Sequence, residues 1–130
     1  MTPVITLRLP VPLVSLNQLK GRHWSARSRG KTEWAEALMV ARARHLAPPT
    51  PPEYRQVVEI TRLMGRGERE FDFENLAGGN AKSLIDALTR LGFWRDDSPR
   101  WLAREYHQRR ATPDEARERV RTIVVIRPEG

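Results

Sequence analysis

The sequence predicts an α/β (α+β) fold: a single domain over residues 1–130, with one mixed β-sheet and two main helices packed on it. Three observations lead to this prediction. A chain of 130 residues fits one domain and buries roughly two-thirds of its unfolded surface, which is enough for a core. Its apolar residues alternate in some segments and recur at helical spacing in others. Those segments follow the order β-α-β-α-β-β, and no repeat or linker divides them.

The first half of the chain contains two strands and one helix. VITLRL at residues 4–9 alternates as a half-buried strand does, and two prolines follow it. After a basic loop, Thr32 is a plausible N-cap for a helix with acidic residues in its first turn. That helix must end before PPTPP at residues 48–52, because proline cannot continue it. The second strand is predicted over residues 54–64.

The second helix is predicted over residues 81–91. FDFEN at residues 71–75 is predicted to be extended and to precede this helix. Asn80 is the candidate N-cap and Gly92 the stop, and four apolar residues in between lie on one helical face.

Two further strands complete the sheet. WLAREYHQ at residues 101–108 and VRTIVVIR at residues 120–127 have strand composition. The segment between them, ATPDEARE at residues 111–118, is predicted to be a polar turn.

The charge of the chain points to a polyanionic partner. The net charge is +7, and residues 1–31 contain six Lys or Arg and no acid, five of them within residues 20–31. Such a segment favours binding to a nucleic acid through counterion release. The alternative is a solvated basic loop without a partner.

Composition also excludes several classes of protein. The chain has no cysteine, which excludes disulfides and cysteine zinc sites, and its three histidines show no metal-ligand spacing. GRGERE at residues 65–70 lacks the spacing of a nucleotide-binding glycine loop, so we expect no nucleotide cofactor. No segment has the apolar length of a signal peptide or a membrane span, so we expect a cytoplasmic protein without a membrane partner.

A group of acidic residues stands out against this basic background. In an extended segment Asp72 and Glu74 would project from one face, where they could share a cation. Asp96 and Asp97 follow the second helix, and the chain could bring them back to the same end of the sheet. Lys82 lies in the first turn of that helix, where the dipole favours anions, so a nearby phosphate or carboxylate would explain it. The alternative is that FDFE is an ordinary half-buried strand and DD a solvated turn.

These residue types suit phosphodiester hydrolysis. Carboxylate oxygens are the ligands of Mg²⁺, with Mn²⁺ as an alternative ion. A bound metal ion lowers the pKa of its water and neutralises charge on the phosphate, and a lysine adds a mobile positive charge. An acidic floor with a basic rim therefore indicates a metal-dependent nuclease.

The same residues resemble a known family. Asp72-x-Glu74-Asn75, then Lys82, then IDALTRLGFWRDD at residues 85–97, is similar to the pattern of the RusA-type Holliday-junction resolvases of bacteria and phages. Their pattern is acid-x-acid-Asn, a lysine, a D-A-L helix and G-F-W-x-D-D. One departure is the second acid, which is glutamate where the family pattern has aspartate.

The resemblance covers about residues 4–126. LPVPLVSLNQLKGRHW at residues 9–24 is similar to the opening of the family, and GGNAKSLIDAL is similar to a phage-like subgroup with Gly-Gly before the lysine. The resemblance implies a bacterial or phage-encoded homodimer that uses Mg²⁺ to cut two strands of a four-way DNA junction in recombination and repair. Paired cuts suit a two-fold symmetric dimer.

The resemblance also assigns roles to individual residues. It implies that the catalytic residues are Asp72, Glu74, Lys82 and Asp97, and that the three acids hold the metal ion. Asn75 would be a helper, and Asp96 an adjacent helper or a structural residue. The candidate DNA-binding residues are Asn17, Lys20, Arg22, Arg27, Arg29, Lys31 and Arg69. Two alternatives stay open: a catalytically weakened module that binds branched DNA without cleavage, and a small basic RNA-binding protein.

Overall fold

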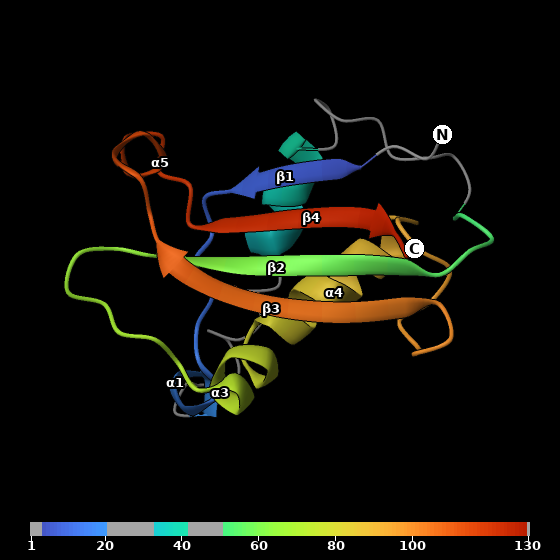
Figure 1. The fold of residues 1–130 in the computed structure, drawn as a ribbon, viewed down its shortest axis with the longest axis horizontal. Coiled ribbons are helices and arrows are strands. Elements are labelled where there is room, and N and C mark those ends of the chain that lie inside the picture. Colours follow the sequence, from blue (N-terminus) through green and yellow to red (C-terminus); the bar gives the residue numbers. More distant parts are fainter. Residues whose placement is uncertain (1–3, 21–32, 42–50, 130) are drawn as a thin grey trace.

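A four-stranded mixed sheet forms the centre of the molecule (Figure 1). The structure, a computed structural model, describes residues 4–20, 33–41 and 51–129. The strands are β1 (Ile5–Leu9), β2 (Gln56–Met64), β3 (Leu102–Arg110) and β4 (Thr122–Pro128), in the spatial order β1-β4-β2-β3. β4 is antiparallel to β1 and β2, whereas β2 and β3 are parallel. The predicted fold class is therefore confirmed.

The parallel pair is joined by a helical crossover. The chain leaves β2 through a loop and forms α3 (Phe73–Gly78) and α4 (Ala81–Arg90), then returns as β3 beside β2. α4 ends as predicted, because Gly92 adopts a positive φ of 86° that side chains rarely take. The edge strand β3 thus runs along the segment that carries the candidate acids.

The core lies between one face of the sheet and the helices. In Figure 1, α4 and the helix over residues 33–41 lie behind the sheet. Period-two alternation turns the same face of β2 and β4 inward, and α4 contributes its apolar stripe. The most buried core residues include Val58, Ile60, Val124, Ile126, Leu84, Ile85, Leu88, Trp34, Phe93 and Trp94.

The prediction that residues 71–75 are extended is wrong. Asp72 is the N-cap of α3, and its side chain accepts a hydrogen bond from the Asn75 backbone N–H. An Asp followed three residues later by Asn satisfies the first turn of a helix locally, and this outweighs the alternating phenylalanines. As a result, Asp72 and Glu74 do not project from one face of a strand.

The sequence did not predict two further short helices. α1 (Leu16–Lys20) follows β1. The predicted polar turn at residues 111–118 instead contains α5 (Pro113–Arg117), which begins with a complete capping box between Thr112 and Glu115.

Asn80 precedes α4 as predicted, but the prediction that its side chain caps the helix is wrong. Its backbone is already helical and its side chain makes no cap hydrogen bond. Instead, it accepts from Val14 N at 2.7 Å and donates to Pro12 O at 3.0 Å, tying the helix start to the N-terminal segment. The proposed cap Thr32 and the predicted end of its helix before residues 48–52 lie outside the described residues.

Within the three described ranges, no helix combines the length and the apolar character needed to cross a membrane.

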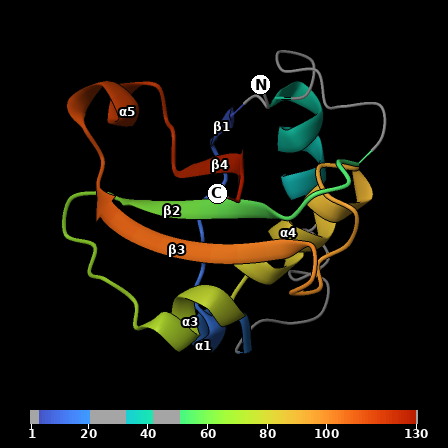
Figure 2. The ribbon, with the colours of Figure 1, turned by 45° about the vertical axis from the view of Figure 1, so that its right-hand side comes forward.

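Figures 1 and 2 both place α1 beside α3, below β3.

Candidate active site

Three side chains on one face of β3 contact the three segments that carry or precede the candidate acids: the turn at Asp97, helix α3 and the backbone of Phe71. Arg104, Tyr106 and Gln108 share a face because side chains alternate along a strand. Arg104 reaches the Asp97 carboxylate at 3.6 Å, and the Tyr106 ring meets the Phe73 ring of α3 edge-on at 5.8 Å. Gln108 binds the backbone of Phe71. The edge strand therefore gathers segments that lie far apart in the sequence.

Asp72 is held by its own helix. Its Oδ1 accepts from Asn75 N and its Oδ2 from Asn75 Nδ2, both at 2.9 Å. The backbone N–H of Asn75, and then its side-chain amide, lower the pKa of the Asp72 carboxyl. The lowered pKa keeps the carboxylate charged, and its exposure makes it accessible to a ligand.

Asn75 connects this acid to the N-terminal segment. While its Nδ2 donates to Asp72, its Oδ1 accepts from the backbone N–H of Asn17 in α1, at 3.1 Å. α1 leads directly into the basic segment of residues 20–31. The helper predicted at position 75 thus joins a candidate catalytic acid to the start of the candidate DNA-binding segment.

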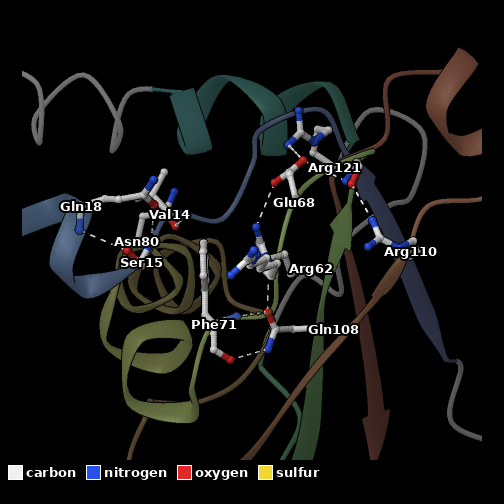
Figure 3. Close-up of polar contacts among 12 residues, drawn as sticks. Val14, Ser15, Gln18, Arg62, Glu68, Phe71, Asn80, Gln108, Arg110 and Arg121 are labelled. Atoms are coloured by element: carbon white, nitrogen blue, oxygen red, sulfur yellow. Dashed lines mark hydrogen bonds and ion pairs between the residues drawn. The ribbon is translucent and has the colours of Figure 1, made fainter.

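The loop before Asp72 is ordered around a buried arginine (Figure 3). The Arg62 side chain is only 6% exposed, donates to Glu68 Oε2 at 2.9 Å and to Arg69 O at 2.8 Å, and lies 3.7 Å from the Phe71 ring centroid. Burial lowers the pKa of Arg62, and Glu68 opposes that shift. Glu68 also accepts from Arg121, at 2.9 Å.

A pocket of about 430 Å³ lies against this loop. Its lining includes Arg62, Arg69, Arg121, Glu68, Phe71 and Gln18. Arg69, a predicted DNA-binding residue, is exposed here.

The junction between α3 and α4 passes very close to the N-terminal segment. A Cβ on Gly79 would lie 1.9 Å from Val14 O, so only glycine fits there. Figure 3 shows Asn80 beside Val14 at this crossing. This close approach of two backbones explains the glycine at position 79.

Glu74 and Lys82 are exposed. Lys82 lies in the first turn of α4, and in the described part of the chain it forms no ion pair, not even with Asp86 four residues further along the helix. Among residues 4–20, 33–41 and 51–129, no carboxylate therefore holds its ammonium group.

The two aspartates after α4 have different roles. Asp96 Oδ1 accepts from Ser98 N at 2.7 Å, and the hydrogen bonds from the Ser98 side chain and backbone lower the pKa of Asp96. Asp97 instead faces Arg104, whose guanidinium also donates to the Asp97 carbonyl at 2.9 Å. Asp96 thus shapes the turn and Asp97 presents a carboxylate toward β3.

The donors Asp72, Glu74 and Asp97 suit Mg²⁺ in chemical kind, being exposed carboxylates. Their oxygen atoms do not all lie within 4.8 Å of one another in this arrangement, in which Asp97 is paired with Arg104. Phe73 and Asp97 nevertheless contact adjacent same-face positions of β3, roughly 6.5–7 Å apart along the strand. Bringing the acids together requires Asp97 to turn away from Arg104, whereas each Asp72 oxygen keeps a lone pair for a ligand beside its hydrogen bond from Asn75.

A different group has the closest metal-like spacing among the described residues. Atoms of Glu59, Glu105 and His107 lie within 4.8 Å of one another on the sheet face opposite the helices. The sequence analysis missed it, since the parallel register that sets Glu59 beside Glu105 is invisible in the chain. Arg127 binds both carboxylates, at 3.1 and 3.0 Å, so an ion-pair network already satisfies them.

The remaining predicted DNA-binding residues divide into two sets. Asn17 is exposed on α1. Arg22, Arg27, Arg29 and Lys31 lie outside the described residues, as does the side chain of Lys20.

Neither protein-family models nor curated proteins give a significant match to this chain.

Proposed function

We propose that this protein is a Mg²⁺-dependent, structure-selective DNA endonuclease of the RusA type, which resolves four-way junctions by paired phosphodiester hydrolysis. The observation that supports it best is the convergence on β3. Segments carrying Asp72, Glu74 and Asp97, the acids of the motif, contact one face of a single edge strand. If the acids were only the solvent-exposed residues of an ordinary strand, the segments that carry them would not need to meet at one strand.

Each residue has a stated role in the proposal. Asp72, Glu74 and Asp97 would hold the ion, which when bound supplies an activated water and neutralises charge on the phosphate. Lys82, exposed and unpaired within the described residues, binds a phosphate oxygen of the cut strand. Arg69 and the basic segment of residues 20–31 bind the DNA backbone.

The proposal includes a homodimer, because paired cuts need one active site for each of two symmetric strands. Sedimentation analysis of the free protein and of its complex with a junction would measure this. A protein that is monomeric in both states would contradict the paired-cut part of the proposal.

The test compares a synthetic four-way junction with a matched linear duplex, with and without Mg²⁺. The wild-type protein should cut only the junction, only with Mg²⁺, at two symmetric positions. Asp72→Asn should lower the cutting rate roughly a thousand-fold, since metal ligation is worth several kcal/mol, while junction binding survives. The fold should persist, because an asparagine oxygen can still accept from Asn75 N.

Asp114→Asn is the matched control, since Asp114 is exposed on α5, away from β3's inner face. It should cut like the wild-type protein. If Asp72→Asn also cut at the wild-type rate, the assignment of the site would be wrong.

The second candidate function is a module that binds branched DNA without cutting it. It is favoured by the pairing of Asp97 with Arg104, which keeps this carboxylate from Asp72 and Glu74. Tight junction binding without any Mg²⁺-dependent product would establish this alternative.

A further inference from the structure

We propose that Gln108, itself held by Arg62, is a positioning residue that fixes the candidate catalytic acid Asp72. This inference rests on the proposed function for its catalytic consequence, whereas its structural part concerns the fold alone. Neither Gln108 nor Arg62 belongs to the RusA-like motif of residues 72–97.

The contact between Gln108 and the chain before Asp72 is two-pronged. Gln108 Oε1 accepts from Phe71 N at 2.9 Å, and Gln108 Nε2 donates to Phe71 O at 2.8 Å (Figure 3). One side chain thus replaces both hydrogen bonds that a neighbouring strand would make. Because Phe71 O and the Asp72 Cα belong to the same planar peptide unit, the second bond fixes the position from which the Asp72 side chain departs.

Arg62 sets the orientation of the Gln108 amide. Arg62 Nη1 donates to Gln108 Oε1 at 3.1 Å. Only one orientation lets this oxygen accept from both Arg62 and Phe71 N while the amide nitrogen donates to Phe71 O. A free glutamine could turn its amide over, but this one loses all three bonds if it does.

Arg62 is in turn restrained on every side. It pairs with Glu68, donates to the carbonyl of Arg69, and places its guanidinium carbon over the Phe71 ring. Since its side chain is almost fully buried, losing any of these partners would leave a desolvated charge, which is costly. The pair Arg62–Gln108 is therefore a rigid support rather than a mobile surface contact.

Asp72 is thus held from both directions along the chain. Gln108 fixes the peptide before it, and Asn75 holds its carboxylate from the next helical turn. A shift of about 1 Å in a reacting group can lower a rate about a hundred-fold. A buried arginine and a glutamine thus fix the position of Asp72.

The first arm of the test measures structure without reference to cleavage. Amide hydrogen exchange of Phe71 and Asn75 is followed by NMR in the wild-type protein, Gln108→Met and Gln108→Glu. In Gln108→Met both amides should exchange at least several-fold faster. Gln108→Glu keeps the acceptor for Phe71 N but loses the donor to Phe71 O, so Phe71 should stay protected while Asn75 exchanges faster.

The second arm measures junction cleavage. Both variants should lower kcat about ten-fold or more with KM for the junction unchanged, because the substrate is still bound and only the acid is misplaced. Glu115→Gln, which weakens a polar network on α5, is the control for general destabilisation and should leave kcat unchanged.

The outcomes separate the two proposals. If exchange at Asn75 is unchanged in Gln108→Met, Gln108 does not position Asp72 and the inference is wrong, whether or not the protein cuts DNA. Faster exchange with unchanged kcat overturns the catalytic consequence. If the wild-type protein cuts nothing, the proposed function fails, and the exchange data still decide whether Gln108 holds Asp72.

Discussion

At the scale of single residues, Gly79 leaves less room for a side chain than any other glycine in the described part of the chain. Its backbone passes so near Val14 that an added methyl group would overlap a backbone carbonyl at 1.9 Å. Asn80 follows at once and bonds to both Val14 and Pro12. One short crossing therefore fixes α4, and with it Lys82, against the segment that leads to α1.

Gly79→Ala should destabilise the fold strongly, by roughly 2–4 kcal/mol, because the clash is with backbone that cannot move aside without breaking the Asn80 contacts. Gly78→Ala is the matched control. Its Cβ would meet only the Leu16 side chain, at 3.2 Å, which can shift. Urea unfolding of the two variants measures the difference, and equal midpoints would contradict the crossing geometry.

Under the proposed function, Asp72 has a structural role and a chemical role at once. Its carboxylate caps α3 and is exposed. A cap needs only an acceptor oxygen, whereas a metal ligand needs the charge. For this reason substitution by asparagine separates the two roles.

At the scale of elements, α5 is stabilised by a capping box and by a neighbouring strand. Glu115, only 5% exposed at its side chain, accepts from Thr112 N and from both terminal nitrogens of Arg109 in β3. The hydrogen bonds from Arg109 are the main cause that lowers the pKa of Glu115 from 4.5 to about 2.

This shift makes stability depend on pH. Because the folded pKa is depressed, the contribution of Glu115 is complete above pH 4.5 and is lost as the pH falls toward 2. Glu115→Gln should lower the free energy of unfolding at pH 7 by about 1.5–3 kcal/mol, the range for hydrogen bonds to charged groups. The deficit should shrink below pH 4.

Urea unfolding between pH 2 and 7 measures this, with Asp114→Asn as the exposed control on the same helix. A deficit that stays constant over that range would show that Glu115 contributes packing and no charge.

At the scale of the whole molecule, the net positive charge suits the nucleic-acid partner that we propose. The chain carries +7, while the candidate acids lie exposed beside the edge strand β3. Association with DNA should therefore release counterions and weaken steeply with salt.

Replacing Lys20, Arg22, Arg27, Arg29 and Lys31 by glutamine should flatten this dependence. If all five bind phosphates, the slope of log K against log salt should fall by about 4–5 units for each bound subunit. Fluorescence anisotropy with a labelled junction measures it from low to physiological salt. The matched control replaces Arg8 and Arg117, exposed arginines paired with acids, and should leave the slope nearly unchanged.

The sequence by itself determined the strands, the two main helices and the candidate residues, since these follow from local periodicity and chemistry. α4 lies within a residue of its predicted range, and the four strands appear where alternation indicated them. Two predictions from the sequence were wrong. Residues 71–75 begin a helix, because the helix cap at Asp72 outweighs the alternation. The side chain of Asn80 does not cap α4, because it bonds to Val14, which is distant in sequence.

Only the tertiary structure decided which segments meet. Alternation along residues 101–108 places Arg104, Tyr106 and Gln108 on one face, but nothing in the chain says that Asp97, Phe73 and Phe71 contact them. Likewise Arg62 reads as one more surface arginine until the loop after β2 folds over it. Such contacts depend on how strands are ordered and helices packed, which is a property of the whole core and not of any local stretch.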